Sequence, residues 1–295
     1  MNKTPLILDT DIGTDIDDAL ALAYLLSQPR CELLGVTTVS GQAPLRAEMA
    51  SAMCHHVGRT DIPIHSGAEQ ALLTDIVQKV APQAEALGNR PRQRNFKPNT
   101  AVDFLRSTIR SRPHEITLLA IGPMTNIGLL FAMDPEIPSL LKSVVFMCGQ
   151  FRDVMRGEWN AFNDPYATAI AYCNGLQTKP PQHLSFGLDV TMQCGMPREE
   201  GRKTLTAKVL EPVRDFAEIW YQHCNHIIWH DPLAAASIFE PEICTYRTGR
   251  VRISLHDPTL GWTVFDEPRE IPHTHTIADG VNAKRFFEHY FEIVK

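Results

Sequence analysis

The 295-residue sequence lacks the marks of a secreted or membrane-spanning protein. Its seven cysteines are scattered without a Cys-x-x-Cys pair, and their odd number prevents all of them from being bridged, so we expect a reduced, cytoplasmic environment. No apolar leader precedes the first expected strand, and we therefore do not expect secretion. The most apolar stretch, residues 116–133, is interrupted by Gly122, Pro123, Thr125 and Asn126, which excludes an uninterrupted membrane helix.

Positive charge is also scarce, and it is not concentrated on any one stretch. The chain has 28 Lys and Arg against 34 Asp and Glu, a formal net charge of -6. A nucleic-acid surface needs a dense basic face, whereas the richest basic stretch, residues 90–97, is typical of a solvated, proline-flanked loop. We expect a small-molecule partner and neither nucleic acid nor membrane. No Ser/Gly-rich linker or internal repeat divides the chain, so we expect one domain over residues 1–295.

Short apolar runs alternate with longer stretches of helical periodicity along most of the chain. This alternation predicts an α/β fold with an open, mostly parallel sheet flanked by helices. The expected strands lie near residues 5–9, 31–40, 62–67, 116–122 and 143–149. The expected helices lie near residues 17–28, 43–57, 99–111, 124–133, 165–174, 199–228, 232–238 and 282–293. Ligands of such sheets gather beyond the carboxyl ends of the strands, where Asp9, Asp11 and residues 40–42, 121–126 and 147–150 fall.

Aspartates crowd the turn between the first expected strand and the first expected helix: Asp9, Asp11, Asp15, Asp17 and Asp18. Helix capping explains one or two of them, with Asp15 as the cap and Asp17 or Asp18 at the positive end of the helix dipole. Capping does not explain Asp11 as well, and crowded carboxylates either take up protons or bind a cation. Because all-oxygen ligand sets suit hard ions such as Ca²⁺ or Mg²⁺, the turn predicts a cation site.

A second candidate feature is the tripeptide His230-Asp231-Pro232, in which the proline fixes the turn that carries the histidine and the aspartate. On its own the tripeptide is more typical of a turn than of a site. His223, His226 and His230 lie at helical spacing, but the zinc motif with its glutamate and closely spaced histidines is missing. We therefore expect a polar pocket wall that touches a leaving group.

Together these segments resemble the nucleoside hydrolase family, in particular its inosine/uridine-preferring type. DTDIGTDIDDALAL resembles the family's opening motif, and TTVSGQ, LLAIGPMTNIGLLFAMDPE, VVFMCG, EWNAFNDPYATA and HDPLAAA follow in the family's order. The resemblance implies an open α/β sheet, one Ca²⁺ per subunit and assembly into homodimers or homotetramers. It also implies a place in nucleoside metabolism, through hydrolysis of the N-glycosidic bond of a ribonucleoside or related riboside.

The resemblance further implies roles for single residues. The metal ligands would be the carboxylates of Asp11, Asp18 and Asp231 and the backbone carbonyl of Ile121. Asp17 would be the base that activates the metal-bound water. The opening loop is two residues longer than usual, and an alignment from the strand side makes Asp15 the base instead.

Other residues would bind the substrate. Glu158 and Asn160 would hold the ribose hydroxyls, and Met147 belongs to the same set of motifs. Loss of the base leaves an oxocarbenium-like sugar, which fixed negative charge stabilises. The leaving base needs a proton or a hydrogen bond, which His230 or Tyr221 could supply.

Two substitutions depart from the family's pattern. Gln42 stands where asparagine is typical, and Arg152 occupies the approximate place of another sugar-binding asparagine. The loop 70–95 also lacks the histidine-glycine pattern common near the base pocket. These departures leave open a modified ribosyl compound or an unusual base, and Arg152 could favour an anionic group.

Two other functions remain as alternatives. LILDTDIGT superficially matches the strand and DxD motif of haloacid-dehalogenase-like phosphatases, but Gly13-Thr14 comes one residue late and no lysine with a following acidic pair is evident. The second alternative is a non-catalytic, metal-dependent module that binds ribose or a nucleoside.

Overall fold

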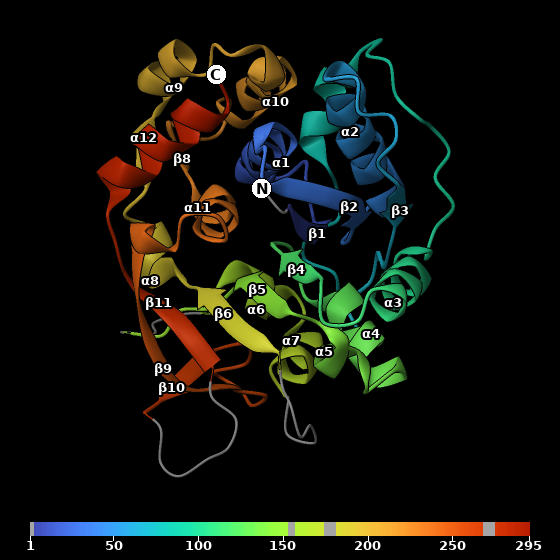
Figure 1. The fold of residues 1–295 in the computed structure, drawn as a ribbon, viewed down its shortest axis with the longest axis vertical. Coiled ribbons are helices and arrows are strands. Elements are labelled where there is room, and N and C mark those ends of the chain that lie inside the picture. The colour runs from blue at the N-terminus through green and yellow to red at the C-terminus, as the bar shows by residue number, and fades with distance from the viewer. Residues whose placement is uncertain (1–2, 153–156, 174–180, 268–274) are drawn as a thin grey trace.

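A computed structural model of the chain describes residues 3–152, 157–173, 181–267 and 275–295 (Figure 1). Its main sheet has nine strands in the order β10-β9-β11-β6-β5-β4-β1-β2-β3. The strands are β1 Thr4–Thr10, β2 Cys31–Thr38, β3 Ile64–Ser66, β4 Thr117–Ala120, β5 Ser143–Met147, β6 Gln182–Phe186, β9 Cys244–Ile253, β10 Thr263–Asp266 and β11 His275–Val281. A separate two-stranded sheet pairs β7 Gly195–Pro197 with β8 His226–Ile228.

Most neighbouring strands of the main sheet run parallel. The pairs from β3 through to β11 are all parallel, whereas β9 pairs antiparallel with both β11 and β10. The expected open, mostly parallel α/β fold is therefore confirmed.

Helices cover both faces of this sheet. They are α1 Asp17–Ser27, α2 Ala43–His56, α3 Ala101–Ser111, α4 Thr125–Met133, α5 Ile137–Leu140, α6 Trp159–Asn163, α7 Pro165–Tyr172, α8 Leu188–Thr191, α9 Arg198–Thr204, α10 Glu211–Trp220, α11 His230–Ser237 and α12 Ala283–Ile293. Three short 3₁₀ helices are η1 Pro82–Leu87, η2 Lys208–Leu210 and η3 Pro241–Ile243. Within the described parts of the chain, no helix has both the length and the apolar character that crossing a bilayer requires.

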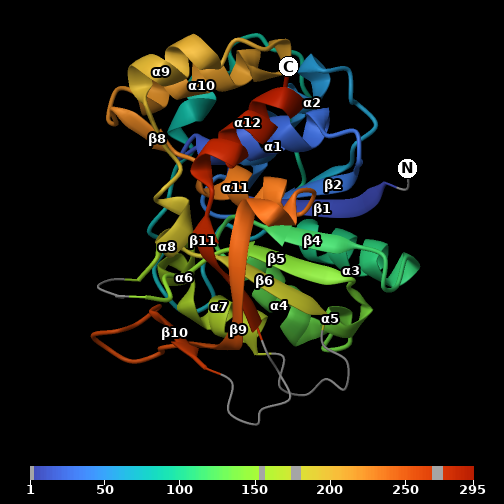
Figure 2. The ribbon, with the colours of Figure 1, turned by 60° about the vertical axis from the view of Figure 1, so that its left-hand side comes forward.

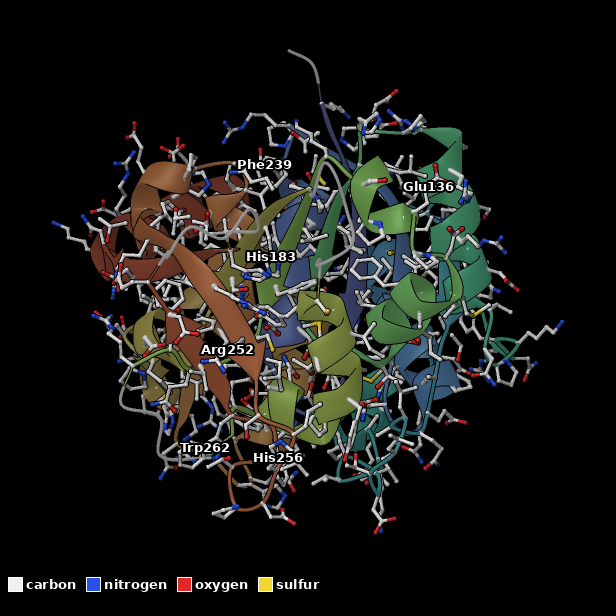
Figure 3. All side chains as sticks on the ribbon, turned by 90° about the horizontal axis from the view of Figure 1, so that it is seen from below. Glu136, His183, Phe239, Arg252, His256 and Trp262 are labelled. Carbon is white, nitrogen blue, oxygen red and sulfur yellow. The ribbon has the colours of Figure 1, made fainter. Side chains whose placement is uncertain are left out.

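The core consists of two apolar layers on either side of the sheet. Leu6 and Leu8 of β1 point into one layer and Ile7 into the other, because side chains alternate along a strand. The first layer contains α1, α2, α11 and α12, and the second contains α3, α4, α5 and α7 (Figure 2). Seen from below, the buried His183 of β6 lies in the middle of the molecule, between Glu136 and Arg252 on opposite sides (Figure 3).

The expected elements differ from the observed ones mainly in the last third of the chain. The expected helix 199–228 is divided into α9, η2 and α10 and ends in β8. The strands β9, β10 and β11 were not expected, and they extend the sheet beyond β6.

Candidate active site

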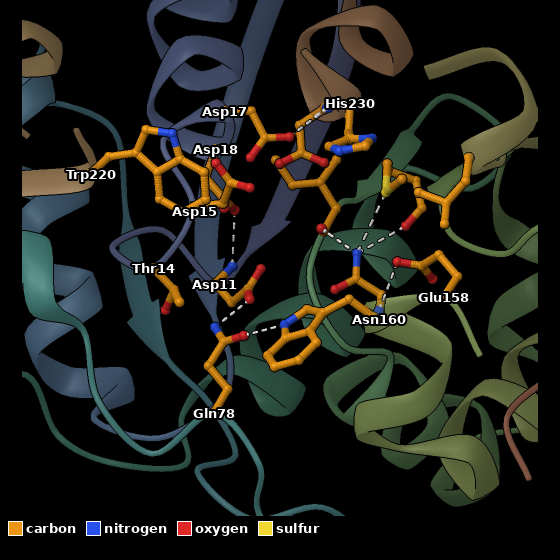
Figure 4. A pocket seen from close by; sticks show the side chains of 15 residues that line it. Asp11, Thr14, Asp15, Asp17, Asp18, Gln78, Glu158, Asn160, Trp220 and His230 are labelled. Carbon is orange, nitrogen blue, oxygen red and sulfur yellow. Dashed lines mark hydrogen bonds between the residues drawn. The ribbon is translucent and has the colours of Figure 1, made fainter. Parts of the chain in front are cut away.

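A cavity of about 340 Å³ opens beyond the carboxyl ends of β1, β4 and β5 (Figure 4). This volume lies within the range of small-molecule sites, roughly 300–1,000 Å³. Asp11 follows β1, Ile121 follows β4 and Met147 ends β5, so the parallel strands deliver all three to the same rim. The cavity is lined by Asp11, Thr14, Asp15, Asp17, Asp18, Gln78, Ile121, Met147, Glu158, Trp159, Asn160, Leu188, Trp220, His230 and Asp231.

The acidic turn joins β1 to α1 through a loop tied by short-range hydrogen bonds. Oδ1 of Asp18 accepts from the hydroxyl of Thr10 and, at 3.2 Å, from the backbone N–H of Asp11. The expectation that Asp15 caps α1 is wrong, because this helix has no side-chain cap. The Asp15 carboxylate instead accepts from the adjacent N–H of Ile16 at 2.6 Å. Asp17 occupies the first turn of α1, where the helix dipole favours negative charge.

Packing of α11 against α1 brings a third carboxylate to this turn. Each of Asp17, Asp18 and Asp231 offers an oxygen atom, and these atoms all lie within 4.8 Å of one another. The backbone N–H of Asp231 donates to Oδ2 of Asp17 at 3.2 Å, across 214 positions of sequence. All three side chains are buried. The predicted meeting of the acidic turn with Asp231 is thus present in the structure.

Burial makes these carboxylates hard to ionise. Desolvation, reinforced by repulsion from the neighbouring aspartates, raises the pKa of Asp17, Asp18 and Asp231 well above the ordinary value. The same causes raise the pKa of Asp15 to about 7, opposed by its bond from Ile16. A bound cation would reverse this balance, because it favours the charged form of every carboxylate around it.

The backbone carbonyl of Ile121, directly after β4, adds an uncharged oxygen to the cavity. Nδ2 of Asn160 donates to the carbonyl oxygens of Ile121, at 2.7 Å, and Met147, at 3.0 Å. Glu158 caps α6 by accepting from the N–H groups of Asn160 and Ala161, at 2.8 and 3.0 Å. Burial raises the pKa of Glu158, and these backbone bonds oppose the shift. Glu158 and Asn160 are therefore held rigidly at the cavity wall.

The remaining wall carries His230 and two tryptophans. Nδ1 of His230 is 2.7 Å from the hydroxyl of Thr191, and burial lowers the pKa of this histidine to about 4, which keeps the ring neutral at pH 7. The indole of Trp159, which is 48% exposed, donates to Oε1 of Gln78. The indole of Trp220 donates to the carbonyl of His226 at 2.9 Å.

Three residues expected to bind substrate do not line the cavity. Gln42 lies at the start of α2 with φ 63°, and its side chain accepts from the N–H of Ala81 at 2.9 Å. Arg152 is exposed and donates to the carbonyl of Asp279 at 2.7 Å. Tyr221 is buried beneath the guanidinium of Arg202, which lies 5.4 Å from the ring centroid. The other ten candidate residues line the cavity: Asp11, Asp15, Asp17, Asp18, Ile121, Met147, Glu158, Asn160, His230 and Asp231.

Five lining residues were not singled out from the sequence: Thr14, Gln78, Trp159, Leu188 and Trp220. Trp159 lies between two candidates in the EWN segment, so its neighbours could have indicated it. Trp220 directly precedes the candidate Tyr221. Gln78 belongs to residues 67–81, which connect β3 to η1 without a helix or strand and carry no periodic signal.

Comparison with known proteins gives a consistent result over nearly the whole chain. The model of the family described as inosine-uridine preferring nucleoside hydrolase matches residues 6–288. A pyrimidine-specific ribonucleoside hydrolase RihA of Enterobacter sp. (strain 638) is 31% identical, over 89% of this chain and 88% of its own. A probable uridine nucleosidase 2 of Arabidopsis thaliana is 29% identical, over 90% of this chain and 86% of its own. The solved purine-preferring ribonucleoside hydrolase from Gardnerella vaginalis superimposes with a TM-score of 0.84 at 26% identity, covering 99% and 98% of the two chains.

Proposed function

Since the chain belongs to the inosine-uridine preferring nucleoside hydrolase family and is a hydrolase that acts on ribosides, we propose that it uses one Ca²⁺ per subunit and an aspartate-activated water to cleave a ribonucleoside. The observation that carries this proposal is the convergence of Asp17, Asp18 and Asp231, three buried carboxylates from α1 and α11. Assembly into a homodimer or homotetramer in the cytoplasm is part of the same proposal and rests on the family resemblance.

The donor atoms of the cavity fit calcium. Carboxylate oxygens and backbone carbonyls are the ligands that Ca²⁺ prefers. The cluster of Asp17, Asp18 and Asp231 offers carboxylate oxygens and contains no sulfur or imidazole. Ile121 lines the same cavity and can offer its backbone carbonyl. Asp11, Asp18, Asp231 and the carbonyl of Ile121 would hold the ion. When bound, the ion would lower the pKa of a water molecule and orient the sugar hydroxyls.

The protein's own residues supply the remaining chemistry. Asp17 accepts the proton of the attacking water, and Asp15 is the alternative base because its pKa of about 7 suits proton uptake near neutral pH. Glu158 and Asn160 hold the ribose hydroxyls on a fixed helix start, beside Met147. The surrounding carboxylates stabilise positive charge that develops on the sugar ring as the base departs.

His230 assists the leaving base as a hydrogen-bond donor. Its low pKa, about 4, means that the neutral ring is the form present at pH 7. In this role the ring takes the tautomer with the proton on Nε2, in which Nδ1 accepts from the hydroxyl of Thr191. His230 therefore assists the leaving base through a hydrogen bond and does not transfer a proton from an imidazolium.

The decisive experiment measures reducing-sugar release from uridine, cytidine, inosine and adenosine. We expect ribose release from at least one of them, its loss in EDTA and its recovery when calcium is restored. Phosphate release from phosphate esters without ribose release would instead favour the phosphatase alternative. Tight nucleoside binding with no turnover in saturating calcium would favour the non-catalytic module.

Measuring both kcat and the Kd for calcium in each variant distinguishes the catalytic base from the metal ligands. Replacement of the base should lower kcat by about 10²- to 10⁴-fold and leave the Kd for calcium within a few-fold of wild type. Asp17→Asn and Asp15→Asn test the two candidates, and Asp231→Asn serves as the ligand variant that weakens calcium binding. Asp61→Asn is the matched control, because the Asp61 side chain is 66% exposed and pairs with Arg59 on the surface.

A further inference from the structure

Arg46 of α2 is fully buried, with 0% of its surface exposed. Arginine is rarely buried unless its donors are satisfied, and here each nitrogen has an acceptor. The acceptors are the carbonyls of Gly41 at 2.9 Å, Asp11, Ile12 at 3.1 Å and Val80 at 3.0 Å, and the hydroxyl of Thr14 at 3.0 Å. One guanidinium thus joins the acidic loop, the turn before α2 and the end of the 67–81 segment.

The guanidinium of Arg46 contacts the backbone of the acidic loop without forming an ion pair to a described carboxylate. Among the ion pairs between described residues, none includes Arg46, and all its hydrogen bonds go to neutral oxygens. Burial lowers the pKa of Arg46, whereas the negative charges of Asp11, Asp18 and Glu69 oppose that shift. The guanidinium remains charged and faces the backbone that carries the first aspartate of the site.

The 67–81 segment brings a second polar group to the same aspartate. Gln78 is 4% exposed; its Nε2 donates to Oδ2 of Asp11, and its Oε1 accepts from the indole of Trp159 at the cavity wall (Figure 4). The segment packs closely against the turn before α2, where a Cβ on Gly41 would lie 2.4 Å from the carbonyl oxygen of Lys79. The position of Gln78 therefore depends on how this segment is held.

Further bonds fix the chain that follows the segment to the acidic loop. The N–H of Gln83 donates to the carbonyl of Gly13 at 3.1 Å, and its side-chain amide donates to the carbonyl of Thr14 at 2.9 Å. Arg46 contacts both sides of this junction, through Asp11 on one side and Val80 on the other.

We propose that Arg46 is a positioning residue that holds the acidic loop against the 67–81 segment, so that Gln78 fixes the Asp11 carboxylate for cation binding. Arg46 sets the backbone of Asp11 and Gln78 sets its side chain. The cation is the one of the proposed function, on which this inference rests. Arg46 acts on the site by fixing the geometry of the loop. Its positive charge alone would repel a cation.

The test is calcium binding to metal-stripped protein, measured by isothermal titration. Arg46→Lys keeps the charge, but a single ammonium cannot reach acceptors spread over three segments, so we expect the Kd to rise about tenfold. Arg46→Met and Gln78→Leu should weaken binding to a similar degree. The double variant Arg46→Lys/Gln78→Leu should lose clearly less than the product of the two single losses, because both residues act on Asp11.

The control is Arg92→Met. Arg92 is partly buried, but it donates to Glu48, Gly88 and Arg90 and does not line the cavity. Its variant should bind calcium as wild type does. A second readout needs no metal: amide hydrogen exchange at Ala81 and Gln83 should be faster in Arg46→Lys than in the control.

Three outcomes would overturn the inference and distinguish it from failure of the proposed function. Arg46 does not position the site if folded Arg46→Lys and Arg46→Met both bind calcium with wild-type affinity. The same conclusion follows if Arg46→Met binds calcium more tightly and Arg46→Lys is unchanged. If the Arg46 variants do not fold, unchanged calcium affinity in Gln78→Leu would overturn it equally. A wild-type protein that binds no calcium would remove the cation site itself, and this inference with it.

Discussion

At the scale of single residues, Asp9 is a buried acid whose two oxygens differ in their surroundings. Oδ1 accepts from the hydroxyl of Thr37 and, at 2.7 Å, from Nδ2 of Asn126. Oδ2 has no hydrogen-bond partner among the described residues. Burial raises the pKa of Asp9 to about 7, with the two bonds to Oδ1 opposing the shift. A neutral carboxyl therefore fits this position better than a carboxylate.

This pKa predicts a pH-dependent effect of Asp9→Asn. Because the pKa is raised in the folded protein, the native state binds the proton more tightly, and the stability that Asp9 contributes is lost as pH rises from about 4 through 7. Asparagine does not titrate in this range. The free energy of unfolding of the variant minus that of wild type should therefore increase as pH rises from 5 to 8, by on the order of 2–4 kcal/mol.

Urea unfolding of both proteins in EDTA at pH 5 and pH 8 measures this difference. Asp61→Asn is again the control, since that exposed side chain has its pKa lowered by the hydrogen bond from Arg59 and should show no such improvement. A free-energy difference between Asp9→Asn and wild type that stays constant over this range would contradict the prediction.

The residue scale also shows which site residues a sequence can reveal. Asp17 and Asp18 lie in an acidic turn whose crowding indicates a cation site, whereas Glu158 is indicated by the resemblance of its segment to a family motif. Gln78 lies in a connection without periodicity, and bonds from Arg46 and Gly41, which are distant in sequence, hold that connection at the site. Tyr221, which was expected to assist the leaving base, lies one position after the lining residue Trp220, and neighbouring residues on a helix point about 100° apart.

At the scale of elements, α4 and α7 approach each other closely at Gly128. A Cβ built on Gly128 would lie 2.7 Å from both Cα and Cβ of Ala167. Alanine has the higher helix propensity, but overpacking against a backbone atom outweighs that gain. Gly128→Ala should therefore lower the free energy of unfolding by about 1–3 kcal/mol.

Thermal or urea unfolding of Gly128→Ala checks this expectation against Gly195→Ala. The Cβ of the control would meet only Cδ1 of Ile228, at 3.2 Å, which is the end of a flexible side chain. We expect the control to stay within about 0.5 kcal/mol of wild type. Equal stability of the two variants would mean that α4 and α7 separate without cost.

The elements that the sequence did not indicate lie where pairing is non-local. The parallel strands β1, β4 and β5 are short, largely buried apolar runs, and such runs are visible in a sequence. In β9 the buried Val251 lies between the exposed Arg250 and Arg252, an alternation that is easily taken for a polar loop. Its register depends on β11, where His275 pairs with Gly249, and no local pattern encodes that contact.

At the scale of the whole molecule, the acidic site connects parts of the chain that are far apart in sequence. Asp17 and Asp231 are 214 positions apart, and their meeting depends on the packing of α1 against α11. An unfolded chain cannot hold these carboxylates together. An ion bound at the site would therefore stabilise the folded protein as a whole, by an amount set by its concentration relative to its Kd.

Calcium should accordingly raise the melting temperature, and the increase should grow with pH. Without metal, burial and mutual repulsion raise the pKa of Asp17, Asp18 and Asp231 in the folded state, so the stability they contribute is present below about pH 4 and is lost as pH rises through their raised values. Calcium competes with protons for the same oxygens, and its binding strengthens as the protons leave. Calcium at about one hundred times its Kd adds about 2.7 kcal/mol, which corresponds to roughly 4–5 °C for a domain of this size.

Thermal scans at pH 5, 6, 7 and 8, in EDTA and in calcium, separate the two effects. The melting temperature in EDTA should fall across this series, and the difference between calcium and EDTA should widen. Asp231→Asn should narrow that difference at pH 8, because it removes one charged oxygen from the cluster and relieves part of the repulsion in the metal-free protein. A melting temperature in EDTA that rises with pH, with no response to calcium, would mean that these buried carboxylates neither hold protons nor bind an ion.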